Sequence, residues 1–281
     1  MHPVMLLPHG ADTSELRQAL WKYRIGHRIT QETDGQLLWI ADPARQQSMQ
    51  ALVQRWERGE PLVLAGQSAP RTASVALPAL RRVPVTAAMI LISLVIFALA
   101  GVFGDQLIVA LTIVPVGVEG GRLAFGTLME SMTSGQVWRL LSPAFLHFGW
   151  MHLIFNLMWV WYFGRQVEVM QGSRIMLLLL LVAGIGANLA QYATGTVLFG
   201  GMSGVVYALL GHVWLMAWRV PRSGFFVPQM LVVFMLGWMV FTMTDFAAVV
   251  GFGNVANEAH LGGLVVGLAT GWYHSMRYSS S

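Results

Sequence analysis

Six long apolar runs constrain the fold of this chain more than any other feature of its sequence. A run of about 17–25 apolar residues crosses the roughly 30 Å hydrocarbon core of a bilayer as a helix, because a helix satisfies its own backbone hydrogen bonds. The predicted spans are residues 85–104, 149–165, 175–193, 202–218, 226–244 and 257–273. Since 56% of the residues are hydrophobic and only 11% are charged, an ordinary soluble globule is excluded. The sequence therefore predicts an α-helical polytopic membrane protein.

The distribution of basic residues predicts how the spans are oriented. Cytoplasmic loops of membrane proteins carry an excess of Lys and Arg. Here the arginines flank one side of successive spans, in the order Arg81, Arg82, Arg165, Arg174, Arg219, Arg222 and Arg277. The segments 193–201 and 245–256, which contain neither Lys nor Arg, are expected outside. Both termini are then cytoplasmic, and the net charge of +4 reflects orientation rather than nucleic-acid binding.

The first residues of the chain bear on how it is inserted, and the lack of cysteine bears on the chemistry it can perform. The N-terminus is polar and the first long apolar run begins after residue 84, so we expect no cleavable signal peptide. The first span would itself direct insertion. With no cysteine, disulfides and thiolate chemistry are excluded.

Residues 1–66 are expected to form a small cytosolic α+β domain. The predicted elements are a helix capped by Asp12 or Thr13 and ending near Tyr23, a hairpin of 27–32 and 36–41 turning at Asp34-Gly35, and a helix over 43–58. A linker over 67–80, rich in Ala, Ser, Pro and Thr, would lead to a membrane domain over 81–276. No site chemistry is evident in 1–66, which favours a structural or dimerising role.

The loop over 105–148 is too long to be a simple connection between spans. Its apolar stretches predict short helices that lie partly in the outer leaflet. We expect Trp138 and Trp150 near the membrane interface, where indole rings are enriched.

Polar side chains within the spans mark the candidate site, because they are unfavourable in lipid and usually face a cavity or a partner. With the N-terminus inside, the second, fourth and sixth spans all begin on the outer side. Near those starts lie His152 and Asn156, Ser203, and His260, respectively. The predicted orientation therefore gathers four reactive or hydrogen-bonding groups in the outer half of the membrane.

Helical spacing suggests how two of these groups meet. Small residues recur in the fourth and sixth spans, at Gly204, Ala208 and Gly211 and at Ala259, Gly263 and Gly267. Small residues let helices approach closely. If the two strips face each other, Ser203 and His260 lie within hydrogen-bonding reach, as nucleophilic catalysis requires.

Each of these residues alone also has a plain packing interpretation. The Gly-x-Ser-Gly pattern of Gly201-Met202-Ser203-Gly204 is common in membrane helices as a packing patch, and a lone histidine such as His260 is more often a hydrogen-bonded packing residue. His147 and His152 would anchor the long loop, and Asn156 would link helices. Their joint occurrence at one depth favours a catalytic site.

The same residues resemble the rhomboid family of intramembrane serine proteases, specifically its bacterial GlpG type with a small cytosolic N-terminal domain. The matching motifs, in order, are Trp138-Arg139, His147-x4-His152-x3-Asn156, Gly201-x-Ser203-Gly204 and Ala259-His260-x-x-Gly263. The resemblance implies a six-transmembrane-helix rhomboid bundle in the inner (plasma) membrane that cleaves transmembrane segments of other proteins near the outer leaflet. It implies no metal and no other cofactor.

The resemblance also implies roles for individual residues. Ser203 would be the nucleophile and His260 its general base, while His152, Asn156 and the Ser203 N–H would line an oxyanion hole. Supporting roles fall to residues around them, namely Tyr207 beside the His260 ring, Gly201 and Gly204 at the nucleophile turn, His147, Trp138, Arg139 and Glu168. No acidic residue in a span is placed to orient His260, so turnover is expected to be slow. The expected partners are transmembrane substrates, the lipid bilayer and a second copy bound through the N-terminal domain.

Three other classes of function are compatible with parts of this pattern. Histidines at one depth are typical of a metal or haem site, but no carboxylate or thiolate joins them and there is no His-Glu-x-x-His pair. A non-enzymatic chaperone on the same fold would lack Ser203 or His260. A transporter would show two related halves with broken helices, which are not evident here.

Overall fold

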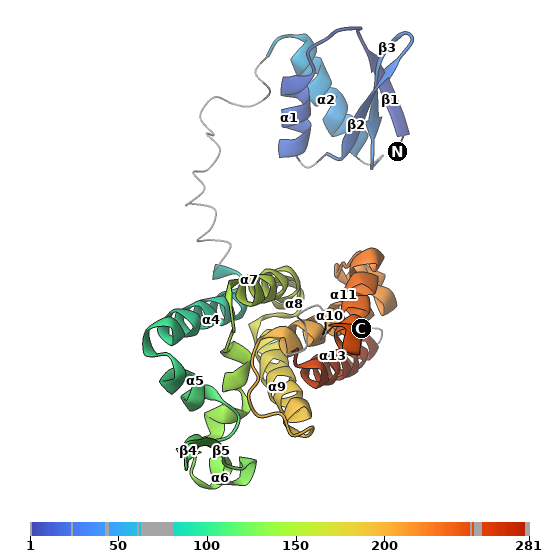
Figure 1. The fold of residues 1–281 in the computed structure, drawn as a ribbon. Coiled ribbons are helices and arrows are strands. Elements are labelled where there is room, and N and C mark those ends of the chain that lie inside the picture. The colour runs from blue at the N-terminus through green and yellow to red at the C-terminus, as the bar shows by residue number, and fades with distance from the viewer. Residues whose placement is uncertain are drawn as a thin grey trace. The chain divides into compact units, whose positions relative to one another are not determined.

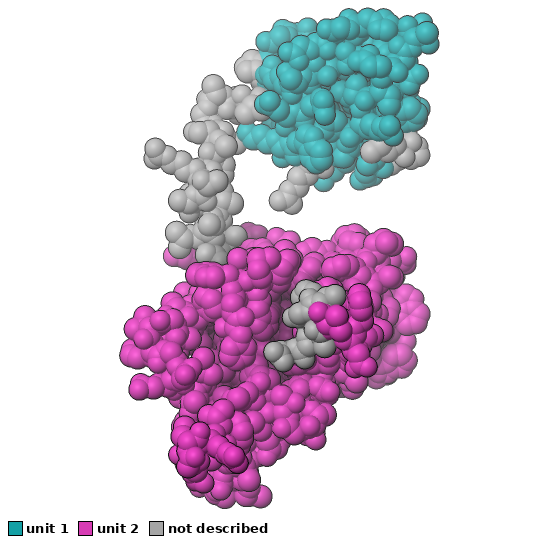
Figure 2. Space-filling model, viewed as in Figure 1, with its two compact units in different colours: residues 1–76 teal, residues 77–281 magenta. Residues whose placement is uncertain are grey.

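The structure, a computed structural model, divides the chain into two compact units, residues 1–76 and 77–281 (Figure 2). It describes residues 2–23, 25–42, 45–60, 62, 81–247, 249 and 255–278. The linker predicted over 67–80 lies outside the described residues, as do residues 248 and 250–254 of the loop predicted over 245–256. The two units are described in turn.

In its described residues, the N-terminal unit has a three-stranded antiparallel sheet and two helices (Figure 1). Its elements are β1 (His2–Leu7), α1 (Ser14–Lys22), β2 (His27–Glu32), β3 (Gly35–Ile40) and α2 (Gln46–Glu57). The strand order is β1-β3-β2, which places the hairpin strand β3 at the centre. Buried apolar residues of both helices and of β3 form one core, including Leu16, Leu20, Leu38, Ile40, Met49 and Val53.

Strand β1 is the element of this unit that was not predicted. Five of its six residues pair antiparallel with β3, at residues 29 to 38 positions further along the chain. The strand is therefore defined by a distant partner and not by a local pattern or turn. The helix, hairpin and following helix lie within a few residues of the predicted ranges.

The second unit, residues 77–281, contains the predicted spans and is called the membrane unit below. Its described residues are mostly helical (Figure 1). Its first half contains α4 (Pro84–Phe103), α5 (Asp105–Leu111), β4 (Val116–Glu119), β5 (Arg122–Phe125), α6 (Leu128–Thr133), η2 (Val137–Leu140), η3 (Ser142–Phe145), α7 (Trp150–Trp159), η4 (Val160–Gly164) and α8 (Arg165–Gln171). Its second half contains α9 (Ser173–Tyr192), α10 (Ser203–Arg219), η5 (Pro221–Ser223), α11 (Gln229–Thr242), α12 (Asp245–Ala247) and α13 (Asn257–Tyr278).

The helices coincide with the predicted apolar runs but differ in length. Among the described residues, α4 and α9 are each long and apolar enough to cross a bilayer, and α11 is a shorter apolar helix. The second predicted span is not one uniform helix, because a π-helical turn, η4, separates α7 from α8.

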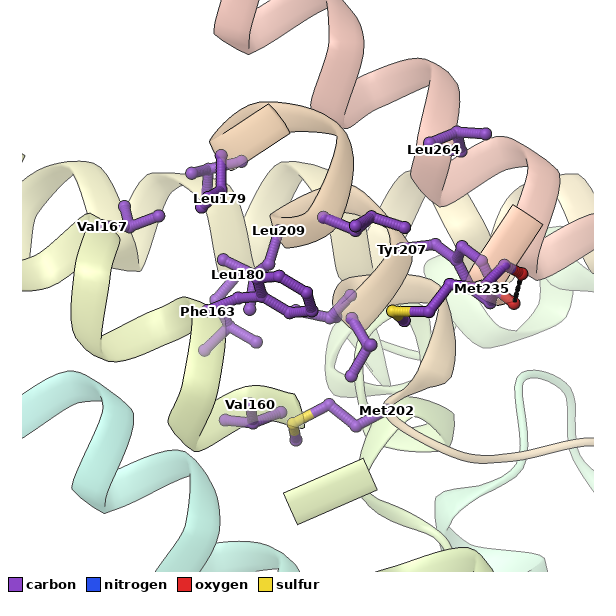
Figure 3. Packing of buried hydrophobic residues seen from close by; sticks show 14 of the residues in the cluster. Val160, Phe163, Val167, Leu179, Leu180, Met202, Tyr207, Leu209, Met235 and Leu264 are labelled. Carbon is purple, nitrogen blue, oxygen red and sulfur yellow. Dashed lines mark hydrogen bonds between the residues drawn. The ribbon is translucent and has the colours of Figure 1, made fainter. Parts of the chain in front are cut away.

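The core of the membrane unit surrounds α10. This helix is buried along most of its length and packs against α9 and α13. Figure 3 shows its Leu209 among Phe163, Val167 and Leu180 of the neighbouring segments. The nucleophile candidate therefore stands at the end of the most enclosed helix of the unit.

The long loop after α4 is more structured than the sequence predicted. Besides the expected short helices, it contains the β4–β5 hairpin, which turns at Gly120 and Gly121 with positive φ angles of 57° and 79°. Trp138 and Trp150 are exposed, at 51% and 68%. Exposure of both rings is compatible with the expected interfacial position.

Arg139 holds this loop together from inside. Arg139 is only 6% exposed, and its guanidinium donates to the carbonyl oxygens of Val109 and Thr112 at 2.9 and 2.8 Å. Trp138 donates to the Ala110 carbonyl at 3.3 Å. The Trp-Arg pair thus ties η2 to the end of α5.

Glu168 performs a similar task at the start of α4. Its carboxylate is 3% exposed and accepts hydrogen bonds from the N–H groups of Val85 and Thr86, both at 2.8 Å. The hydroxyls of Thr86 and Ser173 donate to it at 2.7 Å each. One side chain therefore satisfies free N–H groups in the first turn of α4 and joins α4, α8 and α9.

Replacing Glu168 with Gln should destabilise the membrane unit by about 1.5–3 kcal/mol, because several hydrogen bonds to a buried charge become bonds to a neutral amide. Denaturant unfolding in detergent micelles would measure the change. Glu119→Gln, on the exposed end of β4, is the matched control and should unfold like the unaltered protein. Equal stability of the two variants would contradict this account of α4.

Candidate active site

Ser203 and His260 come together at one end of the α10–α13 pair. Ser203 is the first residue of α10, and His260 lies in the first turn of α13. The Ser203 Oγ and the His260 Nε2 are 2.8 Å apart, a hydrogen bond in which the hydroxyl donates to the neutral imidazole. The pair therefore has the geometry of a nucleophile with its base.

Small residues make this approach of the two helices possible. A Cβ atom at Gly263 would collide with the Gly204 carbonyl, and one at Gly267 would collide with the Ala208 carbonyl. A Cβ atom at Gly211 would lie 3.1 Å from the Leu264 carbonyl oxygen. The two strips of small residues thus face each other, and α10 and α13 are in backbone contact.

Tyr207 lies one turn after Ser203 and packs against the histidine. The ring centroids of Tyr207 and His260 are 4.8 Å apart, with 34° between the planes. The Tyr207 hydroxyl donates to the Met235 carbonyl of α11 at 2.9 Å, the bond drawn dashed in Figure 3. The ring therefore backs the imidazole while its hydroxyl holds α11.

The second nitrogen of His260 is not oriented by a carboxylate. Within the described part of the chain, Nδ1 is buried and has no hydrogen-bond partner. The candidate base is therefore held by its bond to Ser203, by contact with Tyr207 and by the surrounding helix packing.

His152 packs against the turn that precedes Ser203. Gly201 has a φ of 123°, and a Cβ atom on it would lie 2.6 Å from the His152 Nε2. Only glycine fits there, for both its backbone conformation and the closeness of the ring. The imidazole of His152 therefore lies beside the nucleophile turn, two residues from Ser203.

Asn156 follows one turn later on α7 and is 5% exposed. Its Nδ2 donates to the His152 carbonyl at 2.8 Å. A side-chain amide carries two N–H donors, so one donor remains for a ligand.

His147 supports the same turn from the preceding loop. Its Nδ1 lies 3.1 Å from the Phe145 carbonyl oxygen, and its Nε2 accepts from the Met202 N–H at 3.5 Å. The Gly201 N–H donates to the Pro143 carbonyl at 3.0 Å. His147 thus connects the loop before α7 to the residue adjacent to Ser203.

Trp138 and Arg139 belong to the scaffold of the long loop. Their side-chain hydrogen bonds go to backbone carbonyls of residues 109–114 and to Gln136 and Thr112. The resemblance implies a bracing role for both residues, which stays a prediction.

Two polar residues beside His260 were not anticipated. The Gln191 side chain accepts from the Ala259 N–H at 3.1 Å, and Asn257 exchanges hydrogen bonds with Thr242 at 2.7 Å. Together they hold the first turn of α13 to α9 and α11. Gln191 could have been identified from the sequence, because it is a polar residue within an apolar run.

No group of three or more His, Cys, Asp or Glu side chains in the described ranges is arranged to hold a metal ion.

Comparison with known proteins agrees with this architecture. A family model described as the Rhomboid domain matches residues 134–277, and one described as the Rhomboid N-terminal domain matches residues 1–66. The Rhomboid protease GlpG of Salmonella paratyphi A is 31% identical over 244 residues, which cover 83% of this chain and 82% of that protein. The Rhomboid protease GlpG of Yersinia pestis (strain Pestoides F) is 41% identical over 133 residues, about half of each chain. This chain belongs to the rhomboid family of intramembrane serine proteases, as a member of its bacterial GlpG type.

Proposed function

We propose that this protease cleaves transmembrane segments with Ser203 as nucleophile and His260 as general base. The observation that carries the proposal is the 2.8 Å hydrogen bond between the Ser203 Oγ and the His260 Nε2. A serine hydroxyl is a weak nucleophile until an adjacent base accepts its proton. The pairing of these two helices supplies that base.

The reaction proceeds in two halves. His260 Nε2 accepts the Ser203 proton as Oγ attacks the peptide carbonyl, and the resulting imidazolium then donates this proton to the leaving amine. His260 then deprotonates a water molecule that attacks the acyl carbonyl, and the imidazolium returns this proton to the Ser203 Oγ as the acyl–oxygen bond breaks. Each half returns His260 to its neutral form.

His152, Asn156 and the Ser203 N–H are proposed to stabilise the oxyanion. Support comes from the position of the His152 ring against Gly201 and from the second N–H of the Asn156 amide. Donors aimed at a developing oxyanion accelerate acyl transfer strongly because they need no rearrangement during the reaction.

The His260 Nδ1, which has no hydrogen-bond partner among the residues that the structure describes, supports slow turnover. In serine proteases with a triad, a carboxylate on this nitrogen contributes up to about 10⁴-fold in rate. Here Tyr207 and the helix packing orient the ring without adding the charge that would stabilise an imidazolium.

The membrane arrangement that we propose has six spans. They are α4, the α7–α8 segment, α9, α10, α11 and α13, within a membrane domain over 81–276. The arginines at one set of helix ends support cytoplasmic termini and an inner-membrane location with the site toward the outer leaflet. Residues 1–66, joined by a linker over 67–80, would form a cytosolic domain through which two copies associate.

The substrate class follows from the position of the site. A transmembrane helix has its amides hydrogen-bonded internally, so it must unwind before a carbonyl reaches Ser203. Small or helix-breaking residues near the cleavage point should therefore favour cleavage. Water must reach the site through a polar cavity open to the outside.

Ser203→Ala and His260→Ala should both abolish cleavage of a model transmembrane substrate and labelling by a fluorophosphonate probe. Ser223→Ala, a serine after α10 at its other end, is the matched control and should label normally. In-gel fluorescence of the purified protein measures this directly. Normal labelling of the Ser203 variant would eliminate the proposed nucleophile.

Asn156→Ala should lower kcat by about 10²–10³-fold, or about 3–4 kcal/mol, with little change in KM, because an oxyanion donor acts in the transition state. Asn188→Ala is the control, since the Asn188 amide donates to the Leu140 carbonyl and braces the fold. That variant should lose stability but keep its kcat while folded. If Asn156→Ala raised KM and left kcat unchanged, an oxyanion role for Asn156 would be excluded.

Tyr207→Phe should keep kcat within about threefold while lowering stability by about 1 kcal/mol, because the ring remains and only the bond to Met235 is lost. Tyr207→Leu removes the ring behind His260 and should lower kcat further. Kinetics and unfolding of both variants separate the two roles. If Tyr207→Phe lost as much activity as Tyr207→Leu, the hydroxyl rather than the ring would position the histidine.

A further inference from the structure

A groove between α4 and α9 lies apart from the Ser203–His260 site. It has a volume of about 260 Å³ and an apolar wall, to which Pro84, Ala88 and Ile92 of α4 and Leu177 and Leu180 of α9 contribute. All of these except Leu180 are exposed. A groove of this composition suits a hydrocarbon chain and offers almost nothing to a polar ligand.

Three exposed arginines stand at the end of the groove. Arg81 and Arg82 directly precede α4, and Arg174 is the second residue of α9, one turn before Leu177. Within the described ranges, none of the three forms an ion pair. Positive charge is therefore concentrated where the apolar wall begins.

Glu168 does not neutralise this charge through an ion pair. Its oxygens accept from the N–H groups of Val85 and Thr86 and from the hydroxyls of Thr86 and Ser173. Glu168 is buried at the first turns of α4 and α9, whereas all three arginines are exposed. A ligand at the surface would therefore meet the arginines.

We propose that the α4–α9 groove binds one acyl chain of an anionic diacyl phospholipid whose phosphate contacts Arg174 and the Arg81–Arg82 pair. Guanidinium groups bind phosphate oxygens in a bidentate fashion, and arginines at the cytoplasmic surface attract anionic headgroups. Only an amphiphile satisfies both parts of the site. A free phosphate would match the arginines alone, and a neutral detergent would match the apolar wall alone.

The bound lipid would connect the same two helix starts that Glu168 joins from inside. It would thus stabilise the packing of α4 on α9 from the lipid side. This role is separate from the proposed dyad, because the groove shares no residue with the site around Ser203 and His260.

Native mass spectrometry of the full chain in detergent tests the proposal. Phosphatidylglycerol and phosphatidylcholine with identical acyl chains are titrated, and phosphatidylglycerol should bind at least about fivefold more tightly. Arg174→Gln should weaken phosphatidylglycerol binding by about fivefold and weaken phosphatidylcholine binding less, because the choline ammonium of phosphatidylcholine offsets its phosphate charge. Arg222→Gln, an exposed arginine after α10, is the matched control and should bind as the unaltered protein does.

The acyl-chain part is tested by filling the groove from either wall. Ala88→Trp should reduce phosphatidylglycerol binding at least about tenfold, whereas Ala98→Trp, exposed on the same helix outside the groove, should not. Leu177→Trp with Leu178→Trp as control repeats the test on α9. Unfolding temperature and fluorophosphonate labelling show that each variant is folded.

Several results would overturn the proposal. Equal binding of the two lipids would show that the arginines do not select an anionic headgroup and would overturn the proposal. Unchanged binding in both groove-filling variants, or full displacement of the lipid by inorganic phosphate, would reduce the feature to a surface ion site. The proposal is supported if phosphatidylglycerol binding is weakened in the groove-filling variants and in Arg174→Gln and is unchanged in all control variants.

Discussion

Backbone contact between α10 and α13 is the constraint on which the rest of the membrane unit depends. Gly263 lies against the Gly204 carbonyl and Gly267 against the Ala208 carbonyl, at separations that no side chain with a Cβ would permit. Apolar side chains lose little by facing lipid, so close backbone packing is a main source of helix association in a membrane. The contact also sets the heights at which Ser203 and His260 meet. Packing and the geometry of the candidate dyad therefore have one cause.

Buried polar side chains connect the other elements of the membrane unit through hydrogen bonds to their backbone groups. Glu168 satisfies N–H groups at the start of α4, Arg139 binds the carbonyls at the end of α5, and Gln191 accepts from the Ala259 N–H beside His260. An unsatisfied backbone group away from water costs several kcal/mol, so each of these side chains makes a local helix end or loop tolerable. Removing one of these side chains would leave its backbone partners buried without a hydrogen bond. The expected loss of stability is therefore larger than for an exposed ion pair.

The candidate site combines tight support of the nucleophile turn with weak support of the base. His147, His152 and Pro143 hold the backbone around Gly201 and Met202, whereas the His260 Nδ1 has no partner among the described residues. In serine proteases generally, fixed donors stabilise the oxyanion and a carboxylate orients the base. Among the described residues of this chain the nucleophile turn is held at several points, whereas no carboxylate lies on the His260 Nδ1.

The sequence by itself determined the helical membrane class, the approximate positions of the helices, the pairing of Ser203 with His260 as candidates and the rhomboid resemblance. These follow from local composition, from the repeat of small residues every fourth position and from short motifs. Only the tertiary structure decided the pairing of β1 with β3, the β4–β5 hairpin, the break at η4, the role of Gln191 and the groove between α4 and α9. Each of the latter depends on which distant segment packs alongside, or on a departure from regular helix geometry. The hydrophobic periodicity of a single segment specifies neither its distant packing partner nor a departure from regular helix geometry.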